Sequence, residues 1–176
     1  MTISLSSPNV DNYYLGTGVV SVKFETDSDY IDVGNVTALV FTPKITQLDH
    51  FSSRAGTKTK DLSVVISKEA DLKITMEEYT ARNLAMLLMG DVTESGGVVN
   101  IDILTAAAIR CAVKFVGGND VGPQWTMTFP LVDIIPSGSM NPINDGKFGT
   151  IEVTGNVLAD EYGSFGTATA TFPASP

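Results

Sequence analysis

The chain has 176 residues, a net charge of −9 and a hydrophobic content of 43%. This length suits one compact core but is short for two, and the apolar content excludes a disordered chain. The acidic balance disfavours sequence-specific nucleic-acid binding, because an acidic surface repels phosphates. The single cysteine, Cys111, cannot form an internal disulfide and is expected to be a buried apolar side chain.

The two ends of the chain are predicted to extend from the folded domain. Residues 1–17 are mostly polar and read as a flexible N-terminal arm, whereas residues 160–176 are rich in Gly, Ala and Thr and hold at most one strand, 168–172. No basic stretch or long apolar run opens the sequence, so no signal peptide is predicted. The most apolar window, Leu84–Met89, is too short to cross a bilayer. We therefore expect folding in a cytoplasm, without secretion or membrane attachment.

Most elements between these ends are predicted to be strands. Pro130 interrupts one of them, which indicates a sheet edge or a bulge there, because proline has no N–H to donate. No internal repeat or low-complexity linker is evident, so residues 1–176 are expected to form a single, mainly β domain. The strands predicted from alternating or β-branched residues are 19–25, 36–42, 62–67, 71–75, 98–104, 109–116, 125–131 and 150–158.

One helix is predicted over residues 76–89. Thr75 and Glu78 have the spacing of a capping box, and Gly90 suits the C-terminal end. One broad apolar face should pack on the sheet. Either a partner or a covering loop must shield the opposite face, which carries Tyr79, Arg82, Met86 and Met89.

Residues 44–61 break the strand pattern. They have no sustained period, and they hold four of the eleven basic residues, at positions 44, 54, 58 and 60. A connection this long is uncommon inside a compact domain unless it has a function. The alternative is a surface loop without a specific role.

No catalytic constellation is found in the sequence. His50 is the one histidine, which leaves zinc sites and Ser–His–Asp triads unsupported, and no phosphate-binding glycine motif is present. Asp27, Asp29 and Asp32 could cluster around a metal ion, but their spacing does not match a helix-loop-helix calcium site, and a solvated acidic turn is the favoured interpretation. No enzyme activity, cofactor or metal is therefore predicted.

Residues 32–90 resemble the core of the major tail tube proteins of long-tailed bacteriophages. The order and spacing match a strand, a long loop, a return strand and a helix. The motifs that carry the resemblance are Val33-Gly34-Asn35-Val36-Thr37-Ala38-Leu39, Leu48-Asp49-His50-Phe51-Ser52-Ser53, Arg54-Ala55-Gly56-Thr57-Lys58-Thr59-Lys60-Asp61 and Glu77-Glu78-Tyr79-Thr80-Ala81-Arg82-Asn83-Leu84.

The resemblance implies a β-sandwich or barrel-like domain with one flanking α-helix and a long β-hairpin loop. It also implies hexameric rings that stack into a hollow virion tail, assembled in the host bacterial cytoplasm, through which double-stranded DNA passes without sticking. Tape measure, tail terminator and tip proteins are the other implied partners. A flexible, non-contractile tail is favoured, and a contractile one stays open.

Three groups of candidate site residues follow. The inter-subunit assembly loop comprises Lys44, Leu48, Asp49, His50, Phe51, Arg54, Lys58, Lys60 and Asp61. Tyr79, Arg82 and Met86 are expected to form an interface on the outer face of the helix. Ser63 and Ser67, which are short and polar, are candidates for the lumen wall.

Two other functions remain open at this stage. A secreted or surface β-sandwich module of the adhesin type would need a secretion signal. A metal-dependent hydrolase using the Asp27–Asp32 cluster would need a metal and a concave pocket.

Overall fold

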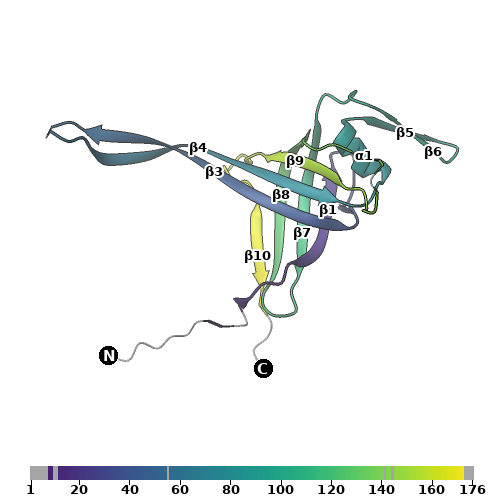
Figure 1. The fold of residues 1–176 in the computed structure, drawn as a ribbon, viewed down its shortest axis with the longest axis horizontal. Coiled ribbons are helices and arrows are strands. Elements are labelled where there is room, and N and C mark those ends of the chain that lie inside the picture. Colours follow the sequence, from purple (N-terminus) through teal and green to yellow (C-terminus); the bar gives the residue numbers. More distant parts are fainter. Residues whose placement is uncertain (1–7, 10–11, 55, 141, 144, 173–176) are drawn as a thin grey trace.

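The computed structural model describes residues 8–9, 12–54, 56–140, 142–143 and 145–172, and it is mainly β with one short helix (Figure 1). The elements in chain order are β1 (Thr17–Phe24), β2 (Ile31–Asp32), β3 (Val36–Ser52), β4 (Thr59–Met76), α1 (Ala81–Leu88), β5 (Asp91–Ser95), β6 (Val98–Asp102), β7 (Ile109–Gly118), β8 (Gln124–Pro136), β9 (Ile151–Val157) and β10 (Thr167–Thr171). The expected mainly β fold class with a flanking helix is confirmed.

Eight strands form one antiparallel sheet, in the order β2-β1-β7-β8-β9-β4-β3, with β10 also paired to β8. The β5–β6 hairpin forms a separate two-stranded sheet. All the strand pairs are antiparallel, both those between consecutive strands and the pairs β1–β7, β4–β9 and β8–β10. Figure 1 shows the β3–β4 hairpin and the β5–β6 hairpin projecting at opposite ends of the molecule.

Strand β8 changes partner at Pro130, as a bulge in that strand permits. Its residues 124–128 pair with β10, and its residues 132–136 pair with β9. In the pairing with β7, Phe129 lies opposite Val113 and Val132 lies opposite Cys111. Two residues of β8, Pro130 and Leu131, therefore face a single residue of β7. The bulge predicted as one explanation of Pro130 is therefore present, at a position where proline's missing N–H removes no ladder bond.

The hydrophobic core lies between the concave side of the sheet and α1. Strands β1, β4, β7, β8 and β9 supply alternating inward residues, which is the period-2 pattern read from the sequence. Burial of this surface drives folding at roughly 25 cal/mol per Å². The fully buried side chains include Val22, Leu72, Ile74, Met76, Met86, Val113, Val132, Ile151 and Val153.

The helix is shorter than the predicted 76–89. Residues 71–76 remain in β4, where Met76 pairs with both Val36 and Ile151, so Thr75 lies in a strand and caps nothing. Thr80 is the actual N-cap, because its side chain accepts a hydrogen bond from the Asn83 N–H at 3.1 Å. At the other end Met89, not Gly90, adopts the left-handed conformation, with φ 44°.

Glu78, assigned to a capping box in the sequence, instead fastens the start of β3. Its Oε1 accepts from the Asn35 N–H at 2.8 Å, and Glu77 Oε2 accepts from Asn35 Nδ2 at 2.6 Å. Gly34 has φ 86°, and a Cβ there would lie 2.2 Å from the Glu78 carboxyl carbon. Only glycine therefore fits this clasp without displacing the carboxylate.

Residues 44–61 are not an irregular loop. Strand β3 continues to Ser52, β4 begins at Thr59, and the two strands pair along this whole length. The strands predicted at 62–67 and 71–75 are parts of the single strand β4. The sequence lacked a clean period here because bulges shift the register after Thr46 and after His50.

The inner part of the predicted N-terminal arm is held against the domain. Thr17 already belongs to β1, and Asn119 joins the preceding residues to the β7–β8 turn. The Leu15 N–H donates to Asn119 Oδ1 at 3.3 Å, and Asn119 Nδ2 donates to the Tyr13 and Pro123 carbonyls at 3.0 Å each. The predicted flexibility of residues 1–7, 10 and 11 lies outside the described residues, as do residues 173–176 of the predicted tail.

Cys111 offers a test of this core. Its side chain is buried, and burial raises the pKa of its thiol to about 12. We expect native protein at mildly alkaline pH to react with a thiol reagent roughly 100-fold more slowly than protein in concentrated guanidinium chloride, because the thiolate forms only after opening. Absorbance of the released chromophore measures both rates. Equal rates in the two conditions would contradict the buried position.

Candidate assembly surface

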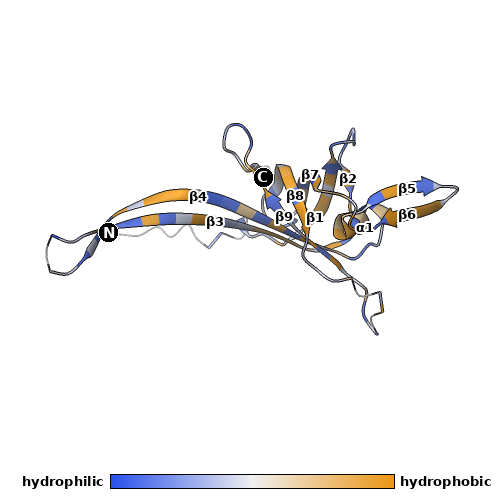
Figure 2. Ribbon diagram, turned by 90° about the horizontal axis from the view of Figure 1, so that it is seen from above, coloured by the Kyte–Doolittle hydropathy of each residue, from blue (hydrophilic) through white to orange (hydrophobic). Residues whose placement is uncertain are grey.

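The most conspicuous feature of the molecule is the outer part of the β3–β4 hairpin, residues 44–69, here called the ribbon. Strand β9 pairs with β4 only from Ala70 inward, so beyond that point β3 and β4 pair with each other alone. At about 3.4 Å per residue, the eight steps from Lys44 to Ser52 carry the tip roughly 27 Å beyond the sheet. Figures 1 and 2 show the ribbon standing clear of the domain in both views.

The ribbon exposes apolar side chains on both of its faces. The register places Ile45, Val65 and Phe51 on one face and Leu48, Val64 and Leu62 on the other. All six are exposed, Leu48 to 63% of its surface. A two-stranded ribbon with no core of its own is marginally stable in water at best, and exposed apolar strands are prone to pair with other chains.

Polar contacts between the strands fix the ribbon's register. Lys60 Nζ lies 2.9 Å from Asp49, whose pKa is lowered first by this hydrogen bond and then by that from Ser63. His50 Nδ1 lies 2.6 Å from Asp61, which occupies the outer bulge. Lys44 pairs with Asp71 at the base, and this contact raises the lysine's pKa. Exposed pairs such as these add little stability, so they set geometry rather than hold the ribbon in place.

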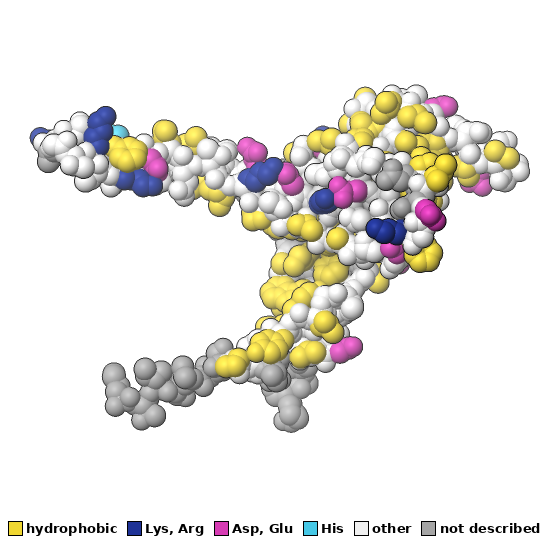
Figure 3. Space-filling view, in the orientation of Figure 1, with side chains coloured by type: hydrophobic (Ala, Val, Ile, Leu, Met, Phe, Trp, Pro, Cys, Tyr) yellow, Lys and Arg dark blue, Asp and Glu magenta, His cyan; other side chains and the backbone are white. Residues whose placement is uncertain are grey.

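All nine predicted assembly-loop residues therefore lie on the ribbon. Seven of them sit on its two strands, whereas Arg54 and Lys58 belong to the exposed turn at the tip. Figure 3 shows Lys and Arg side chains gathered towards that tip and apolar side chains spread along the ribbon. The role of these residues in assembly stays a prediction.

The two predicted lumen residues also lie on the ribbon. Ser63 Oγ donates to Asp49 Oδ1 at 2.7 Å, so it belongs to the polar contacts between the two strands. Ser67 is half-buried and pairs with Thr46 next to the inner bulge. Their assignment to a lumen wall stays a prediction.

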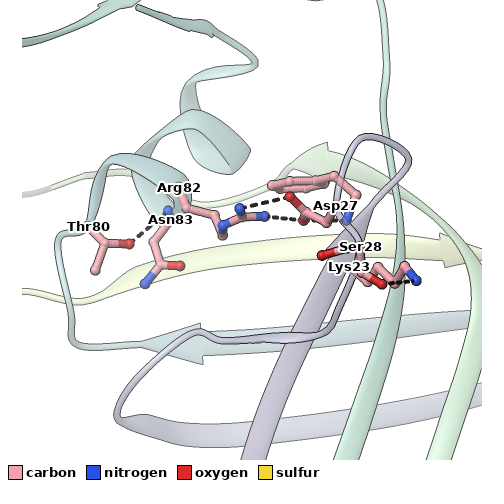
Figure 4. Close-up of polar contacts among 7 residues, drawn as sticks. Lys23, Asp27, Ser28, Thr80, Arg82 and Asn83 are labelled. Atoms are coloured by element: carbon pink, nitrogen blue, oxygen red, sulfur yellow. Dashed lines mark hydrogen bonds and ion pairs between the residues drawn. The ribbon is translucent and has the colours of Figure 1, made fainter. Parts of the chain in front are cut away.

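Two of the three residues predicted to form an interface on the outer face of the helix, Arg82 and Met86, are instead covered by the chain itself. Met86 is completely buried. Arg82 donates to Asp27 from both terminal nitrogens, at 2.6 and 3.1 Å, and its guanidinium lies over the Phe24 ring at 4.6 Å (Figure 4). Tyr79 precedes α1 and is 39% exposed. For Arg82, the covering segment is the one after β1 that contains Asp27, as the alternative of a covering loop expected. Tyr79 stays a candidate interface residue.

Two aspartates of the predicted acidic turn hold the segment after β1 in place through hydrogen bonds. Asp27 binds Arg82 and also accepts from the Phe24 N–H at 2.9 Å, while Asp32 accepts from the Gly34 N–H at 2.9 Å. Within the described residues, no group of three or more His, Cys, Asp or Glu side chains is placed to hold a metal. The two aspartates have structural partners, so the geometry gives the hydrolase hypothesis no support.

An apolar groove that sequence patterns did not predict lies on the concave side of the sheet. It has a volume of about 510 Å³ and lies between β1, β7 and β8 on one wall and β3 and β4 on the other. Phe41 and Phe129 stack across it with ring centroids 5.2 Å apart. The sheet therefore curls towards a barrel without closing, since β2 and β3 stay at opposite ends of the strand order.

A family model described as "Protein of unknown function UCP028589" matches residues 13–98. No curated protein matches the sequence. The helix of the described residues falls well short of the length and apolar character that a bilayer span requires.

Three solved structures are similar over most of the chain. The tail of an empty GTA particle, refined with C6 symmetry, matches at 10% identity and a TM-score of 0.45, over 89% of this chain and 96% of that one. The six-fold symmetrised baseplate of the anti-feeding prophage (AFP) matches at 11% and 0.49, over 96% and 94%. The virion of the native gene transfer agent (GTA) matches at 10% and 0.41, over 88% and 95%.

The Arg82–Asp27 pair can be tested through pH. The Arg82 hydrogen bonds hold the pKa of Asp27 below its ordinary value of 3.8. A lowered folded-state pKa gives stability that is present above the ordinary value and is lost as pH falls through the folded one. We expect Arg82→Met to lower the free energy of unfolding by about 1–3 kcal/mol near neutral pH, because the pair is mostly buried and hydrogen-bonded twice.

Denaturant unfolding at several pH values measures this effect. The difference between wild type and variant should shrink below pH 3.8. Lys73→Met is the matched control, because Lys73 pairs with Glu152 at an exposed site, where an ion pair contributes about 0–1 kcal/mol. A pH-independent loss in Arg82→Met would show that packing, not the ion pair, is what the arginine contributes.

Proposed function

We propose that this chain is a structural subunit that assembles into hexameric rings, and that the rings stack as the hollow tail tube of a phage-like particle through which DNA passes. The ribbon is the observation that carries the proposal. It displays apolar side chains on two faces, beyond the reach of its own domain's core, and burial against other copies is the arrangement that removes them from water.

The way the ribbon is joined to the domain supports this role. Strand β4 is continuous from the tip to the core, where it pairs with β9 and buries Leu72, Ile74 and Met76. A force or displacement at the ribbon therefore acts directly on the sheet, without a hinge loop. A subunit of a mechanically coherent tube needs such a rigid connection.

The sheet also offers open borders that neighbours can complete. Within the described residues, β3 ends the strand order on one side and β2 on the other, and β2 has only two residues. Most of the outer edge of β1 is thus left without a strand partner. Sheets joined across such borders into a closed barrel would remove every edge that could otherwise aggregate.

Charge fits passage of DNA better than binding to it. Six copies of a chain with net charge −9 carry −54. Phosphates are repelled by such an assembly, so DNA could slide through without strong adhesion. The resemblance of residues 32–90 to major tail tube proteins points to the same role, with tape measure, terminator and tip proteins as partners.

Negative-stain microscopy of concentrated protein tests the proposal. We expect rings or tubes of uniform width with a central channel. Sedimentation velocity on the same samples should show species heavier than the 18.7 kDa chain, increasing with concentration. Protein that stays monomeric at every concentration and salt condition would contradict the proposal.

The ribbon's apolar faces can be tested separately. Leu48 and Val64 are directly paired on one face. Changing both to Ser should leave the unfolding free energy within about 1 kcal/mol of wild type, because both are exposed, yet raise the concentration needed for assembly at least about tenfold. Val121→Ser with Ile143→Ser is the control, since these exposed residues lie away from the ribbon. Normal assembly of the Leu48/Val64 variant would show that this face of the ribbon is not part of the interface.

A further inference from the structure

The β5–β6 hairpin and the two residues after it, residues 91–104, form a second unpartnered projection, here called the acidic hairpin. Every residue of its two strands is exposed except Ile101, which is half-buried. One face carries the exposed side chains of Val92 and Val99. Like the ribbon, it is a two-stranded sheet with no core of its own.

Its end is held out in a strained conformation. Leu104 has φ 60°, which a leucine rarely adopts, and its side chain is 72% exposed beside Ile103 at 62%. The Leu104 N–H donates to the Leu88 carbonyl at 2.8 Å, and the Ala106 N–H donates to the Met89 carbonyl at 2.9 Å. The end of α1 therefore fixes two apolar side chains in solvent, where the monomer gains nothing from them.

The acidic hairpin and the ribbon have opposite charge. Residues 44–69 carry five Lys or Arg and three Asp or Glu, a net charge of +2, which leaves −11 for the rest of the chain. Residues 83–109 contain Asp91, Glu94 and Asp102 and no Lys or Arg, a net charge of −3. None of the ion pairs in the described part of the chain involves these three carboxylates.

The pairing within the acidic hairpin sharpens this contrast. Asp91 and Asp102 lie directly opposite each other across the two strands. Like charges in that position repel, so the isolated chain holds an unfavourable pair that a cation from outside would relieve. At the ribbon's tip, Arg54 and Lys58 are exposed cations with no carboxylate between them in the sequence.

We propose that the acidic hairpin of one copy is the docking surface for the ribbon of the next copy. Apolar residues meet apolar residues, and the cations of the tip approach Glu94, Asp102 and Asp91. The two projections lie at opposite ends of the molecule (Figures 1 and 3), so the contact is head to tail. Repetition of a head-to-tail contact gives a closed ring or an open stack rather than a dimer. This inference rests on the proposed function and names the surface that receives the ribbon.

Two charge-reversed chains test the docking. The ribbon-reversed chain carries Arg54→Glu and Lys58→Glu, and the hairpin-reversed chain carries Glu94→Lys and Asp102→Lys. Each alone should need at least about tenfold more protein to assemble, because like charges then meet at every contact. An equimolar mixture should assemble at a concentration within about threefold of wild type, because the two chains can alternate.

Matched controls separate docking from folding and from net charge. Lys147→Glu and Glu161→Lys reverse exposed charges outside both projections and should assemble as wild type does. Thermal unfolding of every variant checks the fold. Carbodiimide coupling of wild-type oligomers gives a readout without substitutions: peptides joining Lys58 or Lys60 to Glu94, Asp91 or Asp102 are expected between copies.

The possible results distinguish this inference from the proposed function. If the hairpin-reversed chain assembles normally while the ribbon-reversed chain does not, the ribbon docks elsewhere and the tail-subunit proposal stands. The same conclusion follows if Glu161→Lys impairs assembly instead, or if the mixture stays unassembled. If wild type itself forms no oligomer, both proposals are wrong.

Discussion

The structure depends on one constraint: a two-stranded ribbon with apolar residues on both faces has no core of its own to bury them. Inside the sheet the same two strands are stable because β9 flanks β4 and the core covers one face. Beyond Ala70 that support ends, but the apolar residues continue. The inner half of these two strands belongs to the folded core, and the outer half is the part that the proposed assembly would bury.

The body of the protein is arranged to hold this ribbon rigidly. The Glu77–Glu78 clasp on Asn35 fixes the beginning of β3 against the end of β4. A bulge between Val36 and Ala38 lies at the same point, where the strand leaves the clasp. The Arg82–Asp27 pair then ties α1 to the segment after β1. Each contact joins segments distant in sequence, so the ribbon's direction is set by the whole domain.

Sequence patterns predicted much of the sheet and little of the site's shape. Strands with one buried face, such as β7 and β9, were found because their apolar residues alternate. The ribbon was placed correctly as the exceptional segment but read as a loop, because two bulges break the alternation and both faces are mixed. Strand β5 was missed although Gly96-Gly97, both with positive φ, mark a two-residue hairpin turn.

The helix shows why local signals failed. Thr75 and Glu78 satisfy the capping-box pattern, but two neighbouring strands hold residue 76 in the sheet and the helix begins after Thr80. Tertiary pairing overrode a local preference worth about 1 kcal/mol. Met86 was placed on the outside by helical phase alone, but it is completely buried. Arg82, on the same predicted face, binds Asp27, which lies more than fifty positions earlier and could not be assigned from local spacing. The groove walled by β1 and β3 is likewise a product of sheet curvature, which no single stretch encodes.

The uneven charge of the chain favours some relative orientations of two copies over others. The body carries −11 and the ribbon +2, so a contact between two bodies that includes neither ribbon brings like charges together. Apolar contact alone does not discriminate among orientations, since it depends on area rather than direction. Repulsion between bodies removes most of the wrong arrangements, while the head-to-tail approach is the one in which a cationic tip meets an acidic projection. At higher salt the repulsion is screened together with the attraction, so apolar contacts persist while their selectivity declines. In the proposed assembly, the acidic composition therefore limits how copies can meet.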